Sequence, residues 1–526
     1  MMKKIFFIVI FLGLSFKSFA VIETEDIGGI NPETVGVNTY DTKFIPTDLW
    51  EGLSHTQVVR LIKNLPTKFK NNFWTRLQIS LLLSPMKVPE NKTGENNIFN
   101  LRFEKLLDME AVDQAYNLGK NHADQLDEDS WAWCQFIHFL IHNNYDKAFS
   151  IAQEFALKDK DNKWQHAVIT MQLLMGKDDQ ANLSLSLLEK ENKKQDHHFI
   201  KTIKQIQAGE KIKGTEHSPH RPLIIKLMVS KNIIPEDMSI ESMSDDIILM
   251  MILDPGFEKF SDRMKLSILE YYTEQSTHKP QLLKDHYLKL ATEDLVKEAT
   301  QKISNKEYDK ENDPLIRAAL YKIFVDSEGE EIKKMAFSAF YKNAYANKIL
   351  TVAVACFGND YNYPAAAYDK DYSFAFVLHN LMLQNKSQMK AWVEGLNQEE
   401  LSELSLILLA SCNLDYFSGE TQEHLMENVK KIYLEPAKKF LFKEKLKFLH
   451  NVSSPFKLSD SRLIDVISGQ YGFGAGLSIL LSSSQSILST DVWQAAVQLR
   501  VLEALKLKNQ ATQLRQLYAY SSAKDE

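Results

Sequence analysis

The sequence predicts an all-α fold, a superhelix of stacked helical hairpins preceded by an extended N-terminal arm. From Asp48 onward, apolar residues recur at helical spacing, and no alternating run bounded by hairpin turns marks a strand. Between residues 98 and 210, the pattern repeats every 33 residues. The preceding segment, residues 21–46, is rich in Gly, Thr, Asn and Pro and has no helical period.

The chain of 526 residues is too long for one compact core. We expect a signal peptide at 1–20 and an extended arm or linker at 21–46, followed by three helical regions. These are an N-terminal repeat region at 47–212, a middle region at 213–312 and a C-terminal repeat region at 313–526. The arm is expected to be peripheral, so that its deletion leaves the helices folded.

The first twenty residues have the form of a secretory signal. Lys3 and Lys4 precede the apolar run IFFIVIFLGL, and Ser18-Phe19-Ala20 places small residues where a signal peptidase reads them. The run is too short for a finished membrane span, and no later apolar run approaches about 20 residues. We therefore predict an exported protein, periplasmic or secreted, with no transmembrane segment after the signal is removed.

Charge argues against nucleic acid as a partner. Removal of residues 1–20 takes away three lysines and no acidic residue, which changes the formal net charge from −7 to −10. Nucleic-acid binding needs clustered Lys and Arg. An acidic mature chain instead favours a neutral or basic protein partner.

The chain has three cysteines, and each lies in an apolar segment with helical character. Their number is odd and their spacings are wide, which does not suit a disulfide framework. We expect Cys134, Cys356 and Cys412 to be buried free thiols.

The segment WAWCQFIHFLIHNNYDKAFSIAQEFA, which begins at Trp131, is one unit of the 33-residue repeat. Each unit reads as a helix, a short polar turn and a second helix, with the turns DMEAVD, NNYD and GKDD. An alanine follows each turn aspartate by two positions and allows close helix approach. The aligned positions are Trp131 with Trp164, Leu107 with Leu140 and Leu173, Asp113 with Asp146 and Asp179, and Ala115 with Ala148 and Ala181.

This unit resembles the tetratricopeptide-type helical hairpin, whose period is 34 residues. The resemblance implies an α-solenoid, because a lone hairpin cannot bury its apolar faces and neighbours must stack. The full tetratricopeptide consensus is absent. The order of elements also resembles a family of secreted helical-repeat proteins of alphaproteobacteria, through DLWEG (48–52), LIKNLP (61–66), LLLSP (81–85) and DPLIRAALY (313–321). That family has no assigned activity and so implies no functional residues.

Cys134, His138 and His142 are the first candidate metal ligands, because residues at i, i+4 and i+8 share one helix face. The outer two lie about 12 Å apart along a helix axis, too far for one ion. His138 and His142 could share an ion, but the segment HFLIH lacks the glutamate of HExxH enzymes. Neighbouring repeats fill these positions mostly with apolar residues, so packing is the favoured interpretation.

A second candidate metal site consists of two histidine pairs that flank one predicted helix. The four residues are His197, His198, His217 and His220. They lie in the polar stretches EKENKKQDHH and GTEHSPHRP, and we favour ordinary solvated loops over a metal site.

The longest irregular insertion is GNDYNYPAAAYDKDY, residues 358–372. A solvated loop is the favoured interpretation. The first functional alternative is a protein-contact loop, and the other is a calcium site formed by the loop's aspartates. The candidate partner-binding residues are Tyr361, Tyr363, Tyr368 and Tyr372.

The sequence shows no G-x-S-x-G, H-E-x-x-H or C-x-x-C motif and predicts no catalytic residue and no cofactor. We therefore predict a non-catalytic, exported scaffold that binds a protein or peptide partner of the cell envelope. One alternative is an enzyme or accessory subunit for an envelope polymer such as peptidoglycan, with the superhelix as a substrate cradle. Another is metal handling through the histidine clusters.

Overall fold

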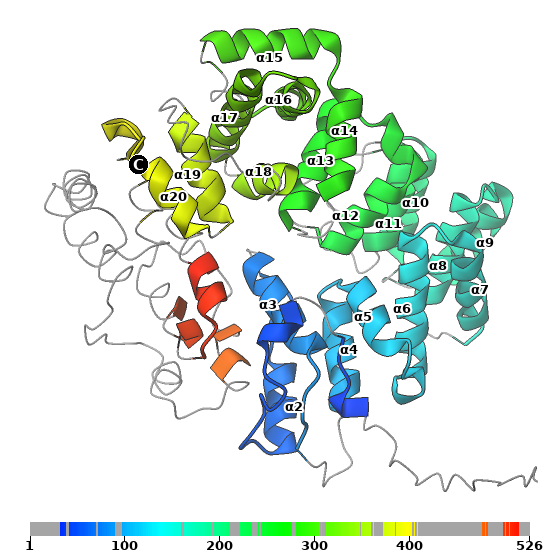
Figure 1. Ribbon diagram of the computed structural model, residues 1–526. Helices are drawn as coiled ribbons and strands as arrows, with labels where there is room; N and C mark the ends of the chain where they lie inside the picture. The colour runs from blue at the N-terminus through cyan, green and yellow to red at the C-terminus, as the bar shows by residue number, and fades with distance from the viewer. Residues whose placement is uncertain are drawn as a thin grey trace, which may run out of the picture.

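The computed structural model is helical wherever it describes the chain (Figure 1). The described residues are 32–401, except 38–40, 70–71, 90–96, 159–161, 192–193, 195, 211–220, 234–239, 241–242, 276–279, 306, 308–311, 348, 359–360, 362–371 and 384, together with 404, 408, 476–478, 480–481, 498–499, 501–503 and 505–514. These residues contain no strand, which confirms the all-α prediction for them. The predicted signal peptide lies outside them.

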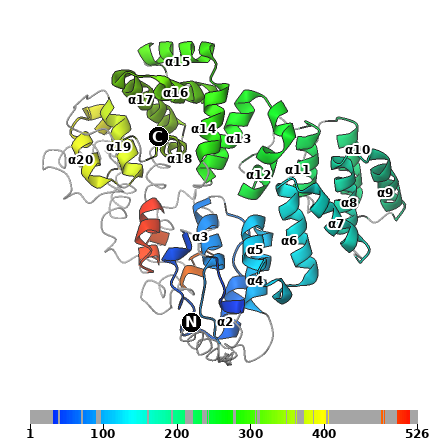
Figure 2. The ribbon, with the colours of Figure 1, turned by 45° about the vertical axis from the view of Figure 1, so that its right-hand side comes forward.

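The N-terminal helices follow one another in a row. They are η1 (Pro32–Thr34), η2 (Asp41–Phe44), α2 (His55–Lys63), α3 (Asn72–Leu83), α4 (Ile98–Asp108), α5 (Val112–Gly119), η3 (Ala123–Gln125), α6 (Glu128–Ile141), α7 (Tyr145–Ala156), α8 (Lys163–Leu174), α9 (Asp178–Glu191) and α10 (His197–Gln207). Each helix from α4 to α9 packs against the next one along the chain. Both ribbon views place α9 and α10 at the outer edge of the molecule (Figures 1 and 2).

A left-handed residue ends the first helix of each hairpin. The backbone φ angle is 57° at Glu110 and Asn143 and 70° at Gly176 and Gly209, so these residues recur every 33 positions. At Asn143, the N–H groups of Asn143 and the next residue return to carbonyls of α6 at 3.3 and 2.8 Å. The same pair of bonds forms at the other three turns, as in a Schellman helix end. The 33-residue spacing of the sequence is therefore present in the backbone.

These four turns lie side by side at one edge of the stack, which we call the turn edge. His142 before the second turn contacts Asp113 after the first, at 3.1 Å. Asp146 and Met175 line one pocket between the second and third turns. Gln207 before the fourth turn donates to Asn182 after the third, at 2.8 Å. The predicted close-packing alanines, Ala115, Ala148 and Ala181, are all buried behind this edge.

The remaining described helices continue the curved path toward the yellow helices at the left of Figure 1. They are α11 (Arg221–Ser230), α12 (Asp245–Leu253), η6 (Pro255–Lys259), α13 (Asp262–Gln275), α14 (Pro280–Leu290), α15 (Glu293–Asn305), α16 (Pro314–Asp326), α17 (Glu330–Ala346), α18 (Leu350–Phe357), α19 (Ser373–Met382) and α20 (Lys386–Val393). This part is not a simple row, because α11 packs on α8, α12 on α6, and α18 on both α13 and α14.

Several helix ends follow directly from local sequence. Ser54 and Gln57 form a reciprocal capping box at the start of α2. Asp313 caps α16 through the Leu315 N–H, and Pro314 occupies the first helical position. In the facing helix α17, Ala336, Ala339 and Phe340 are buried, whereas Ile332 is 50% exposed. Ile332 lies in the first turn of α17.

Residues 32–37 pack into the N-terminal core. The buried Glu33 carboxylate accepts a hydrogen bond from the Ile98 N–H at 2.7 Å, at the start of α4. The Val37 N–H donates to the Leu83 carbonyl at 2.8 Å. A Cβ atom at Gly36 would lie 2.2 Å from the Pro85 nitrogen, so this backbone contact requires glycine.

The buried side chain of Arg102 of α4 binds the same segment. Its guanidinium is fully buried and donates to the carbonyls of Glu33 and Val35 and to those of Leu82 and Ser84, at 2.6 to 3.3 Å. Burial lowers the pKa of Arg102 to about 9, which leaves the group charged at neutral pH. The expectation that the arm is peripheral is therefore wrong for residues 32–37, because their carbonyls solvate a buried cation.

A second buried charge joins the helices α13, α14, α16 and α17. Arg317 donates two hydrogen bonds to the Glu270 carboxylate, at 2.7 and 2.6 Å, and a third to Asn343 at 2.9 Å. Tyr287 donates to the same carboxylate at 2.6 Å. A buried pair with every partner in place is costly to break on one side, so this network fixes how the four helices meet.

Two of the three cysteines lie in the described part of the chain. Cys134 and Cys356 are buried free thiols, as predicted, and Cys412 lies outside the described residues.

Replacement of Arg102 by leucine is expected to destabilise the protein by about 3 kcal/mol or more, because four buried carbonyls lose their donor. Urea denaturation followed by far-ultraviolet circular dichroism measures the change. Arg60→Leu is the matched control, since Arg60 is exposed on α2. Equal midpoints for the two variants would contradict the anchoring role.

His379 is expected to make the protein less stable in mild acid. Burial lowers the pKa of His379 to about 4, and Tyr341 Oη lies 2.7 Å from its Nδ1. In the unfolded chain the pKa is about 6.5. Between these values the unfolded state binds more protons, so the free energy of unfolding falls as pH falls through this window.

His379→Gln is expected to remove a loss on the order of 3 kcal/mol between pH 7 and pH 4. Urea midpoints at several pH values for this variant and for His198→Gln, an exposed control, test the sign. Burial raises the pKa of Glu274 to about 7, so protonation of Glu274 raises the free energy of unfolding as the pH falls. The test therefore compares the two variants at each pH, because both keep Glu274. Parallel pH profiles for the two variants would refute the assignment.

Candidate functional site

Among the described residues, one group of three potential ligands brings its donor atoms together. Asp113, His138 and His142 place one oxygen and two nitrogens within 4.8 Å of one another. Asp113 Oδ1 lies 2.7 Å from His138 Nδ1 and 3.1 Å from His142 Nε2. Asp113 Oδ2 also lies 3.1 Å from His142 Nε2. The group lies on the turn edge.

The three side chains come from opposite ends of two neighbouring helices. Asp113 occupies the first turn of α5, His138 the last turn of α6, and His142 the C-cap of α6. The N-terminus of α5 therefore meets the C-terminus of the neighbouring α6. Helix dipoles favour an anionic group at the first position and a cationic group at the second.

Asp246 of α12 caps the N-terminal end of α5. Ala111, the N-cap residue of α5, offers no side-chain acceptor. Asp246 Oδ2 supplies one instead and accepts the Asp113 N–H at 2.9 Å. Burial and the nearby Asp113 carboxylate raise the pKa of Asp246 well above its usual range.

Tyr116 fixes the His138 ring. The two rings are stacked with centroids 3.8 Å apart and planes 5° from parallel. The side chains of His138 and Asp113 are 18% and 23% exposed, and that of His142 is 36% exposed. Burial alone would raise the pKa of Asp113, but the hydrogen bonds and charges of His138 and His142 outweigh it and lower that pKa. The cluster is thus partly buried and open to water on the His142 side.

Cys134 does not belong to the cluster, although it shares the α6 face in sequence. Its thiol is fully buried and lies 3.8 Å from the Val112 carbonyl, the acceptor of a weak S–H bond. Burial raises the pKa of the Cys134 thiol, which disfavours the thiolate that binds metals.

The sequence places His138 and His142 correctly as neighbours, but it does not single out Asp113 as their partner. The signal that identifies it is the repeat itself. Asp113 aligns with Asp146 and Asp179 as the first-turn aspartate of each second helix. The packing of successive helices sets Asp113 beside the end of α6 and Asp146 beside the end of α8.

An open pocket of 580 Å³ adjoins the cluster along the turn edge. Its lining residues are His142, Asn143, Asn144, Tyr145, Asp146 and Met175. Asn143 links this edge to the middle helices, because its Nδ2 donates to the Leu253 carbonyl at 2.6 Å and its Oδ1 accepts from Lys226. Lys226 is fully buried and pairs with Asp254 at 2.9 Å.

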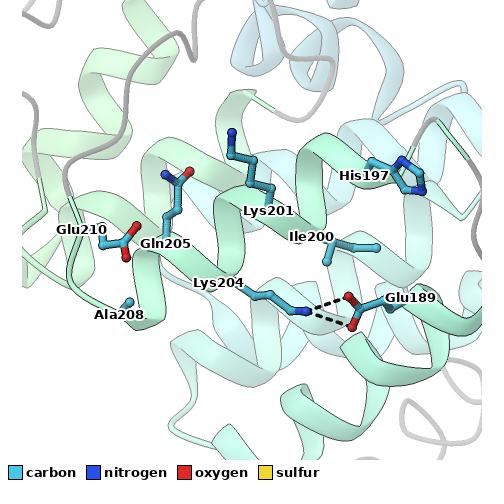
Figure 3. A pocket seen from close by; sticks show the side chains of 8 residues that line it. All are labelled: Glu189, His197, Ile200, Lys201, Lys204, Gln205, Ala208 and Glu210. Carbon is cyan, nitrogen blue, oxygen red and sulfur yellow. Dashed lines mark hydrogen bonds and ion pairs between the residues drawn. The ribbon is translucent and has the colours of Figure 1, made fainter.

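Two of the four histidines of the second candidate metal site lie in the described part of the chain. His197 and His198 are exposed on α10, whereas His217 and His220 lie outside the described residues. His197 lies at one end of a pocket of 570 Å³ and Glu210 at the other, and Lys204 reaches across to Glu189 at 2.8 Å (Figure 3). No carboxylate or third imidazole of the described residues completes a ligand set with His197 and His198.

The tyrosine loop is described only at its two ends. Tyr361 packs in the aromatic core, with ring centroids 4.7 Å from Phe324 and 5.0 Å from Phe337. Tyr372 is 9% exposed and donates to Glu331 at 2.6 Å. Both side chains pack against other residues of the chain, and their role in partner binding stays a prediction. Tyr363 and Tyr368, with the aspartates of the calcium alternative, lie outside the described residues.

Comparison with protein-family models, with curated proteins and with solved structures gives no match. The resemblances to tetratricopeptide-type repeats and to the alphaproteobacterial family therefore stay predictions. None of the described helices is both long enough and apolar enough to cross a membrane.

Asp246→Asn is expected to change the free energy of unfolding by less than about 1 kcal/mol, because a neutral amide keeps an acceptor for the Asp113 N–H. Asp246→Ala removes the acceptor and is expected to cost about 1–3 kcal/mol. It is also expected to speed amide exchange of residues 112–119, measured by hydrogen–deuterium exchange. Equal exchange in both variants would show that Asp246 does not cap α5.

Proposed function

We propose that this protein is an exported, non-catalytic scaffold that binds a protein or peptide partner of the cell envelope. The observation that carries the proposal is the set of four left-handed turns at 33-residue spacing, each with the same pair of backbone hydrogen bonds. Such regularity is typical of stacked repeats, in which each unit contacts its neighbours and adds to one extended surface.

We further propose that helices α4 to α10 form a tetratricopeptide-like α-solenoid. Their sequential packing and the buried alanine of each second helix support this. The period of 33 is one residue shorter than the 34 of the tetratricopeptide unit. Stacked helical hairpins of this kind present long surfaces without catalytic residues.

The outer end of the stack offers apolar contact area. Leu183 and Leu187 lie one helical turn apart on α9 and are 64% and 55% exposed. Adjacent exposed leucines favour contact with another protein surface. The formal charge of −10 after removal of residues 1–20 favours a neutral or basic partner.

Partner binding is expected to depend on Leu183 and Leu187 of α9. Crosslinking in cells, followed by affinity capture and mass spectrometry, identifies proteins held by the wild-type chain. The double variant Leu183→Ser with Leu187→Ser is expected to reduce the captured amount several-fold. Leu157→Ser is the matched control, because Leu157 is 91% exposed but lies at the end of α7.

A captured protein supports the proposal only if it also binds the purified mature chain. Incubation of the purified chain with peptidoglycan tests the alternative of an envelope-polymer enzyme. Release of muropeptides that persists through purification would refute the scaffold proposal and support the envelope-polymer enzyme.

A further inference from the structure

We propose that Asp113, His138 and His142 form a binding site for one divalent transition-metal ion of the zinc class. The site lies at the surface between α5 and α6 and is independent of the proposed scaffold function. Three side chains from two helices supply the ligands, so no single helix has to span the ion.

The donor set matches the preference of such ions. Zn²⁺ is bound by imidazole nitrogen and carboxylate oxygen at about 2.0–2.2 Å, and two histidines with one carboxylate is an established three-ligand set. Imidazole donors favour Zn²⁺, Cu²⁺ and Ni²⁺ over Mg²⁺ and Ca²⁺, which prefer oxygen. The donor atoms already lie within 4.8 Å of one another, so small side-chain rotations bring all three onto one ion.

Neighbouring groups hold the ligands in place. Asp246 fixes the Asp113 backbone, and Tyr116 stacks on His138 at 3.8 Å. Contacts of this kind orient metal ligands and raise affinity. The exposure of His142 leaves the fourth coordination position open to water, as in sites that exchange their ligands.

The repeat supplies a control within the same chain. Asp146 occupies the position equivalent to Asp113, but the positions equivalent to His138 and His142 are Met171 and Met175. Asp146→Asn therefore removes the same kind of carboxylate from the same kind of turn without removing a ligand.

The test uses the mature chain without a polyhistidine tag, stripped with a chelator and then titrated with Zn²⁺ by calorimetry. We expect one ion per chain. His138→Ala, His142→Ala and Asp113→Asn are each expected to lower the affinity at least tenfold. Asp146→Asn and the double variant His197→Ala with His198→Ala are expected to leave it unchanged, with circular dichroism confirming that every variant is folded.

Titration with Co²⁺ gives a second, spectroscopic readout. A bound ion with two imidazoles and a carboxylate is expected to give visible d–d absorption that the three ligand variants lose and the two controls keep. Wild-type chain that binds neither ion at 100-fold molar excess of metal would overturn the proposal. Binding that survives loss of both His138 and His142, or that disappears with His197 and His198, would also overturn it.

Discussion

The structure depends on the left-handed residue that ends the first helix of each hairpin. This backbone conformation reverses the chain in a few residues and returns two N–H groups to the preceding helix. Because it recurs at positions 110, 143, 176 and 209, the turns collect on one edge. That edge carries the ligand cluster and the adjoining pocket, and the middle helices dock against it through Asp246, Lys226 and Leu253.

Buried charges set the positions of parts that hydrophobic packing alone would leave adjustable. Arg102 is solvated by four carbonyls from two chain segments, and Arg317 is paired with Glu270 between four helices. Lys226 pairs with Asp254 where the middle helices meet the turn edge. Apolar side chains tolerate sliding and exchange, whereas a desolvated cation is stable only where all its acceptors are in place. Each of these cations therefore disfavours any helix arrangement that separates it from its acceptors.

Local sequence was sufficient for much of the fold. Capping at Ser54 and Asp313, the turn residues and the buried alanines all depend on neighbours within a few positions, and each was predictable. The packing of residues 33–37 was not, because it depends on Arg102, which lies about seventy positions away. Helical spacing also shows which face of α17 Ile332 occupies, but not that its side chain is 50% exposed.

The candidate site shows the same division. His138 and His142 are one helical turn apart in the sequence, so their proximity was evident. Asp113 reaches them only because two helices run in opposite directions, and the periodic aspartates were interpreted as turn residues alone. Asp246 comes from a region in which the repeat is no longer visible, and no pattern in the sequence connects it to α5.

The equivalence of Asp113 and Asp146 makes the ligand set modular. In these two units the hairpin geometry places a carboxylate beside the end of the next first helix, and the side chains at the two facing positions differ. Histidines fill them once, and Met171 and Met175 fill them one unit later. A chain of this type can gain, lose or move such a site by exchanging two side chains, with no change in backbone.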